Sequence, residues 1–284
     1  MKKILFVTDS CADLPYNYLG DNVKVVPFKF NYKGEKDTLR DNRYEGKVNN
    51  TRRDTHLIES MGACYCEVLN TLNYATDEDM DVIVLYSSGN LDKHNKAAFE
   101  MATDDFKKNN MDKRVTVIDS KNISVALGLL FNKVIELYNN KRSYDEIVTY
   151  IVQNLDKYRF DIETDELSYY EDPEKMGFID RCKLQGKANS SLLTIKGGKV
   201  VVAKRCNDLS IRREILIDRF VDDADLEEKA AIVYNEDCSY EADALRTLIQ
   251  EQVGEVDIDI IEASRVSGTV IREYGLGLAY KLKK

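Results

Sequence analysis

The sequence has no tryptophan, three prolines and two histidines among its 284 residues. So few histidines leave little for a zinc ligand set or for the activation of a nucleophile. No run comes near the roughly 20 apolar residues that cross a bilayer. The first apolar stretch, residues 4–8, is too short for the apolar region of a signal peptide. We therefore expect a cytoplasmic protein with no stable membrane insertion.

The composition also argues against nucleic acid as a partner. The formal net charge is −9, whereas nucleic-acid binding needs a basic surface. With 43% hydrophobic and 32% charged residues, the chain is typical of a soluble globular protein of about two domains. Its six cysteines are scattered, and the Cys64-Cys66 pair has neither the C-x-x-C spacing nor a second pair. We expect reduced, structural thiols, no metal and no cofactor.

Signatures of nucleotide-binding loops and hydrolase elbows are missing as well. The sequence contains no G-x-x-x-x-G-K-[ST], no G-x-G-x-x-G after a strand and no G-x-S-x-G. His56 lies in a polar stretch, and His94 follows Ser88 by six residues on a predicted helix. A serine nucleophile would require His94 to fold back toward the strand end, whereas helical spacing predicts that it faces solvent. We predict no catalytic residues.

The most informative stretch is residues 81–106. Val82 to Tyr86 is an apolar, β-branched run typical of a buried parallel strand, and Ser87, Ser88 and Gly89 follow it directly. Asn90 or Asp92 can cap the helix that comes next. Hydroxyls between a strand end and a helix start favour an anionic ligand. The alternative is that these serines merely cap and turn the chain.

The remaining pattern predicts two domains. Strands are expected at 4–8, 23–28 (ending near Pro27) and 115–118, with helices at 57–72, 123–138 and 144–155 and a polar surface excursion at 29–55. This alternation predicts an amino-terminal α/β domain with a parallel sheet, residues 1–159. A hairpin at 190–203, helices at 211–220 and 240–252 and strands at 230–234 and 256–261 predict a smaller α+β domain with a mixed sheet, residues 160–284.

Two predicted strands end in Asp-Ser, at Asp9-Ser10 and at Asp119-Ser120. Clustered carboxylates can bind Mg²⁺. Short acidic residues at such places also cap loops and helices, and we favour that interpretation.

Several segments together resemble the DegV family of bacterial fatty-acid-binding proteins. The matching segments run in the family's order along nearly the whole chain: TDSCADLP (8–15), VKVVPFKF (23–30), IVLYSSGNLDKHNKAAFEMA (83–102), VTVIDSKNISVALGLL (115–130), SLLTIKGGKVVVAKR (191–205) and SGTVIREYGLGLAY (267–280), the last resembling a glycine-rich strand. The resemblance implies a long-chain fatty acid in a tunnel between two domains, presented to a separate fatty acid kinase, with no catalysis by the binding protein.

The resemblance also implies which residues hold the ligand. Ser87 and Ser88 are the candidates for the carboxylate end, with Gly89 beside them, and Ser60 matches a family serine. Gly268 and Thr269 match a second family segment. The chain departs from the family at Glu59 (threonine in the family), at Val270 (histidine) and near Phe178, where an arginine is missing. Leu57, Met61, Ile123 and Leu127 suit either tunnel or plain core, and we leave them out of the predicted site.

Two further hypotheses remain open. A divergent member of such a family could have lost fatty-acid binding and serve as a scaffold or bind another ligand. Alternatively, the protein could be a hydrolase that uses Ser88 or a metal ion bound by Asp9 and Asp119.

Overall fold

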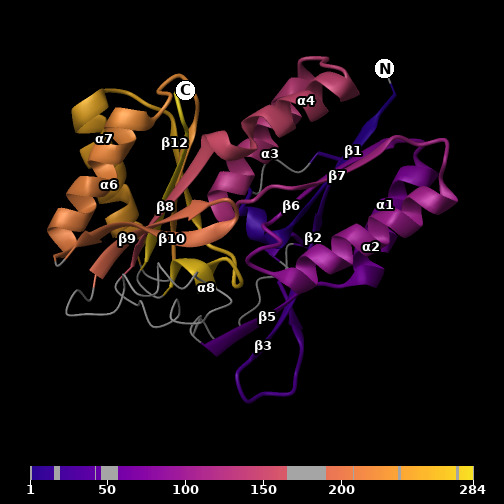
Figure 1. Ribbon diagram of the computed structural model, residues 1–284, viewed down its shortest axis with the longest axis horizontal. Helices are drawn as coiled ribbons and strands as arrows, with labels where there is room; N and C mark the ends of the chain where they lie inside the picture. Colours follow the sequence, from indigo (N-terminus) through magenta and orange to yellow (C-terminus); the bar gives the residue numbers. More distant parts are fainter. Residues whose placement is uncertain are drawn as a thin grey trace.

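The computed structural model describes residues 2–15, 20–41, 43–45, 57–164, 190–206, 208–235, 238–272 and 275–283. These residues form three sheets with helices packed between and around them (Figure 1).

The amino-terminal sheet is entirely parallel. Its strands lie in the order β2 (Val23–Val26), β1 (Ile4–Asp9), β6 (Asp81–Tyr86) and β7 (Val115–Asp119). All residues of β1 and β6 are buried. Central strands covered on both faces need such near-continuous apolar sequence, which is why the parallel sheet could be predicted.

Four helices accompany this sheet: α1 (Tyr65–Asp77), α2 (Lys93–Asn109), α3 (Ser124–Asn139) and α4 (Tyr144–Asn154). Helix α1 packs on β1 and β2, and α2 lies against α1 and β7. Helix α3 packs its Tyr138 ring edge-on to Phe6 of β1, with centroids 5.2 Å apart. Asp92 caps α2 by accepting the Asn95 N–H at 2.9 Å, as one of the two predicted caps.

The second sheet is mixed and has six strands. They lie in the order β10 (Lys199–Cys206), β9 (Ser190–Lys196), β8 (Tyr158–Thr164), β13 (Leu276–Lys281), β11 (Ala230–Tyr234) and β12 (Ile258–Glu262). Helices α6 (Leu209–Asp223) and α7 (Ser239–Val253) pack on it. The predicted hairpin at 190–203 is formed by β9 and β10, which pair antiparallel.

Side chains that alternate along the strands of the mixed sheet pack into two separate apolar cores. Leu192 belongs to the cluster that includes α6 and α7 residues, whereas its neighbour Leu193 belongs to the cluster that also contains β1, β6 and α3. Helix α3 contacts β8, β11 and β13. It is therefore packed between the two large sheets, and one continuous apolar core joins them.

The helix predicted over 57–72 is wrong in its first half. Residues Ile58–Ala63 form a strand, β5, and α1 begins only at Tyr65. Gly62 has φ +67, and a Cβ there would lie 2.7 Å from the Asn95 backbone nitrogen. The apolar stripe resembled a helix, but pairing with β3 and this close approach to α2 determine the strand.

The polar stretch predicted as a surface excursion contains further structure. Strands β3 (Phe28–Tyr32) and β4 (Leu39–Arg40) join β5 in a small antiparallel sheet of order β4-β3-β5. Pro27 separates β2 from β3, which belong to different sheets, as expected for a residue that cannot donate to a ladder. Residues 46–56, including His56, lie outside the described part.

The glycine-rich strand expected over 267–280 is only partly correct. A short helix, α8 (Gly268–Ile271), precedes β13, which begins at Leu276. Among the described helices, none combines the length and the apolar character needed to cross a membrane. The division at residue 160 stays a prediction, and β8 on either side of it belongs to the six-stranded sheet.

Candidate functional site

The carboxyl ends of β1 and β6, neighbours in the parallel sheet, bring Asp9 next to Ser87. Asp9 accepts the Ser87 N–H at 2.7 Å, the Cys11 N–H at 3.1 Å and the Asn95 side-chain amide at 3.2 Å. The Asn95 amide also donates to the Ser87 hydroxyl at 3.1 Å. Asp9 therefore holds the loop after β6 and the start of α2 in fixed positions.

Burial raises the pKa of Asp9 to about 6, although hydrogen bonds from Ser87, Asn95 and Cys11 oppose that rise. One of these bonds comes from the Ser87 hydroxyl. The Asp9 carboxyl group thus holds the loop together through several hydrogen bonds. Its pKa of about 6 means that it titrates at slightly acidic pH.

Ser88 is fully buried and connects the loop to the second sheet. Its hydroxyl donates to the Gly198 carbonyl at 2.8 Å and accepts the Asn90 N–H at 3.2 Å. The Asn90 side chain donates to the Gly197 carbonyl at 3.0 Å. The turn between β9 and β10 is thus fastened directly to the loop that follows β6.

Ser60, on β5, is hydrogen-bonded to the last residue of this loop. Its hydroxyl donates to Asp92 at 2.8 Å and accepts the Gly62 N–H at 3.2 Å. Because Asp92 also caps α2, strand β5 is tied to the first turn of that helix.

These residues surround a cavity of about 250 Å³. It lies between the loop after β6, the small sheet and the connection from β12 to β13. Its described lining consists of Phe28, Ile58, Glu59, Ser60, Ser87, Ser88, Leu91, Asp92, Ile123, Val266, Thr269 and Val270.

The cavity brings together four of the six predicted site residues: Ser60, Ser87, Ser88 and Thr269. Gly89 and Gly268 do not line it. The Gly89 N–H donates to Asp119 at 3.2 Å, and the Gly268 carbonyl accepts the Asn235 side-chain amide at 3.3 Å. Both glycines therefore support neighbouring segments.

Two of the departures from the family pattern, Glu59 and Val270, line the cavity, while Phe178 lies outside the described residues. Of the four candidates left between tunnel and core, only Ile123 is in the lining. Four apolar residues of the cavity wall were not among the predicted site residues: Phe28, Ile58, Leu91 and Val266. Phe28 and Ile58 alternate with polar neighbours on short strands, a pattern that could have identified them. It was overlooked because most of β3 fell in the predicted surface excursion and β5 fell in the predicted helix.

The carboxylates predicted as alternative metal ligands have other roles. Asp119 accepts the N–H groups of Gly89 and Lys121, and Asp9 accepts the donors described above. Within the described ranges, no group of three or more metal-ligating side chains is assembled. His94 is exposed, as helical spacing predicts.

Asp13 forms a buried clamp between segments that adjoin the cavity lining. Its carboxyl group accepts the hydroxyls of Ser124 and Ser267, both at 2.6 Å, the Ser264 N–H at 2.8 Å and the Arg43 guanidinium at 3.1 Å. Burial raises the pKa of Asp13, and Arg43 and the hydroxyls oppose the rise. The clamp fixes the segments that carry Ile123 and Val266 into the cavity wall.

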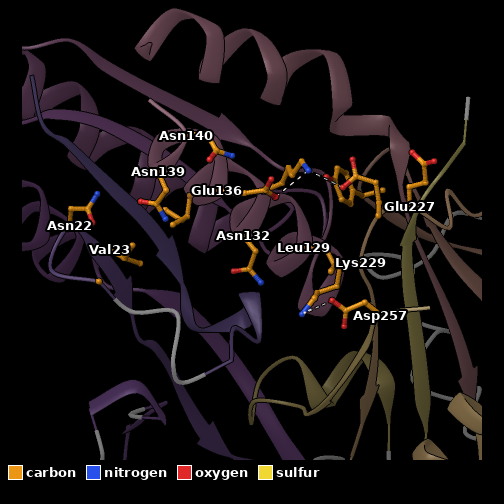
Figure 2. A pocket seen from close by; sticks show the side chains of 15 residues that line it. Asn22, Val23, Leu129, Asn132, Glu136, Asn139, Asn140, Glu227, Lys229 and Asp257 are labelled. Atoms are coloured by element: carbon orange, nitrogen blue, oxygen red, sulfur yellow. Dashed lines mark ion pairs between the residues drawn. The ribbon is translucent and has the colours of Figure 1, made fainter. Parts of the chain in front are cut away.

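Figure 2 shows a second and larger cleft, of about 640 Å³, between α3 and the segments near Lys229 and Asp257. Lys133 pairs with Glu136 and Glu228 at 3.1 Å each, and Lys229 pairs with Asp257 at 3.3 Å. No predicted site residue lines it, and its charged side chains largely satisfy one another. The smaller cavity, with hydroxyls and apolar walls together, is the better candidate.

The cavity therefore lies where the end of the parallel sheet, the small antiparallel sheet and the connection between β12 and β13 of the mixed sheet meet. The chain belongs to the DegV family: the family model described as "Uncharacterised protein, DegV family" matches residues 3–171. It is 29% identical over 150 residues to the DegV domain-containing protein SA1258 of Staphylococcus aureus strain N315. That match covers 52% of this chain, and the chain spans about half (51%) of the length of that relative.

Solved structures with the same fold cover the whole chain. A DegV family protein from Thermus thermophilus, described by its fatty acid binding, has a TM-score of 0.80 at 21% identity and covers 99% of this chain and 100% of its own. The Streptococcus pneumoniae Fatty Acid Kinase (Fak) B3 protein, loaded with linoleic acid, has a TM-score of 0.80 at 15% identity, with 99% and 100% covered. At these identities the likeness establishes the fold.

Proposed function

We propose that this protein binds one long-chain fatty acid, or a lipid of the same shape, in the cavity next to Ser88, and acts as a cytoplasmic carrier. The observation that carries the proposal is the composition of the cavity wall. Hydroxyls from Ser60, Ser87 and Ser88 stand beside apolar side chains from the small sheet, from the start of α3 and from the segment before β13. Such a wall suits a molecule with one polar group and a long apolar part.

Burial of the apolar part would supply most of the affinity, at roughly 0.8 kcal/mol per methylene removed from water. The described cavity, about 250 Å³, lies just below the range of roughly 300–1,000 Å³ for small-molecule sites. A long acyl chain must therefore widen it or extend past the described walls. The Thermus thermophilus and Streptococcus pneumoniae proteins named above support such a ligand, because each is described with a fatty acid.

Native mass spectrometry of the purified protein, followed by solvent extraction, tests the proposal. We expect a stoichiometric excess of mass that extracts as a lipid, or that forms on incubation with long-chain lipids. Val270→Phe, which enlarges a wall residue, should lower the occupancy. Val152→Phe makes the same change at an exposed position on α4 and should leave it unchanged. Melting temperatures of both variants separate lost binding from lost folding. A protein that stays unloaded after incubation with a panel of such lipids would contradict the proposal.

A second candidate role is presentation of the bound acid to a fatty acid kinase, which the likeness to the Fak B3 protein favours. The kinase would transfer the γ-phosphoryl group of ATP to the bound carboxylate and release ADP. Acyl phosphate that forms with kinase and loaded protein, but not with kinase and free acid, is the expected result. No acyl phosphate from the loaded protein would contradict this role.

A further inference from the structure

The backbone donors of the loop after β6, residues 87–92, are already used. The Ser87 N–H donates to the Asp9 carboxyl group at 2.7 Å and the Gly89 N–H to that of Asp119 at 3.2 Å. The other four N–H groups of residues 87–92 donate to oxygens of Ser88 or to a carbonyl on the next loop. A ligand anion needs such donors, and here the protein's own carboxyl groups and carbonyls occupy them.

The hydroxyl donors are also taken. Ser60 donates to Asp92, Ser88 to the Gly198 carbonyl at 2.8 Å, and Thr269 to the Val266 carbonyl at 2.7 Å. Ser87 hydrogen-bonds to the Asp9 carboxyl group. These oxygens keep lone pairs free, so the cavity offers acceptors and has no spare hydroxyl proton among the described lining residues.

The charge of the described lining has one sign. Glu59 and Asp92 are carboxylates, and no lysine, arginine or histidine is among the described lining residues. Asp92 sits at the amino terminus of α2 and accepts the Asn95 N–H, so it fills the place where the helix dipole would favour a ligand anion. The Glu59 backbone pairs with Asn31 of β3, and its side chain, which is exposed at the cavity mouth, has no hydrogen-bond or ion-pair partner among the described residues.

From these contacts we infer that the site selects a lipid whose head group is uncharged and donates a hydrogen bond, such as a hydroxyl or a protonated carboxyl group, over an ionised carboxylate. This inference rests on the proposed function and specifies its ligand. Among the described lining residues, an ionised head group would meet two carboxylates and no free hydroxyl donor. A hydroxyl head group would find Glu59, Asp92 and the serine oxygens as acceptors.

Equilibrium binding of three ligands of equal chain length tests the inference at pH 8: hexadecanol, methyl hexadecanoate and hexadecanoic acid. We expect hexadecanol to bind about tenfold more tightly than the acid, since the carboxylates of Asp92 and Glu59 both line the cavity and would repel an ionised head group, although solvent weakens the effect of the exposed Glu59. The ester, which is uncharged but has no donor, should bind more weakly than the alcohol. An ester that binds as tightly as the alcohol would overturn the donor requirement.

Glu59→Gln removes one of the charges and disturbs no described hydrogen bond. It should tighten binding of the acid about fivefold and leave the alcohol unchanged. Glu78→Gln makes the same change at an exposed position after α1 and should alter neither.

Acid binding as tight as alcohol binding, with no effect of Glu59→Gln, would overturn this inference and leave the lipid-binding proposal standing. Binding of none of the three ligands would overturn both.

Discussion

At the scale of single residues, the contact between Ser88 and Gly198 leaves no room for a side chain at Gly198. Gly198 has φ +79, and a Cβ there would lie 2.4 Å from the Ser88 hydroxyl oxygen. The neighbouring Gly197 also has a positive φ, +57, but has nothing within 4 Å of its Cβ position. Both glycines have a left-handed backbone, but only Gly198 lacks room for a Cβ, so Gly197 is a suitable control for substitutions at Gly198.

We predict that Gly198→Ala lowers the free energy of unfolding by about 1–3 kcal/mol more than Gly197→Ala does, because only the first substitution overpacks. Urea denaturation measures both. Combining Gly198→Ala with Ser88→Ala removes the obstructing oxygen and should shrink the difference. Equal costs for the two glycines would show that the contact is unimportant.

A second residue-scale prediction concerns pH. Burial raises the pKa of Asp9 from 3.8 to about 6, so the folded protein holds this proton more tightly than the unfolded chain does. The contribution of Asp9 to stability is therefore fully present below about pH 4 and is lost as the pH rises through about 6. Two pKa units correspond to about 3 kcal/mol.

Asp9→Asn cannot titrate. The free energy of unfolding of the wild type, relative to that of Asp9→Asn, should thus fall by up to about 3 kcal/mol between pH 4 and pH 7. A relative stability that is constant across this range, or that rises with pH, would contradict the assignment.

At the scale of elements, the Asp13 clamp joins the end of β1, the start of α3 and the loop after β12. We predict that Asp13→Ala costs about 3–5 kcal/mol of the free energy of unfolding, because it leaves buried donors and the Arg43 guanidinium without their shared acceptor. Asp21→Ala, in an exposed turn, should change it by less than about 0.5 kcal/mol. Thermal and urea unfolding compare the two variants. A cost for Asp13→Ala no greater than that of Asp21→Ala would show that the clamp does not hold these elements together.

The elements also show what the sequence could and could not predict. Long periodic or continuous apolar stretches, such as β6, α2 and α3, were predicted because local pattern and burial agree. Strand β5 was missed because its pairing with β3 and the close approach of Gly62 to α2 are tertiary facts. Chain order placed Ser87 and Ser88 beside each other, but it could not show that the Ser88 proton goes to Gly198 or that Val266 faces the same cavity.

At the scale of the whole molecule, the shared core around α3 predicts cooperative unfolding. One apolar cluster contains Val84 of β6, Leu130 of α3 and Ala279 of β13, so the parallel sheet and one face of the mixed sheet share a core. Hydrogen exchange in increasing urea, read by mass spectrometry, should give coincident midpoints for peptides covering β6 and β13. Separate midpoints would show two independent folding units.

The bond between Ser88 and the β9–β10 turn has a consequence for loading. The Ser88 hydroxyl can donate one hydrogen bond, and the Gly198 carbonyl accepts it. A ligand that takes this proton leaves a buried carbonyl without its donor, so the turn must shift or find another partner. A ligand that accepts a hydrogen bond from Ser88 would then compete with the Gly198 carbonyl for the same donor. By linkage, if such a ligand weakens the contact between the turn and Ser88 by some factor, an interaction that stabilises this contact weakens ligand binding by the same factor.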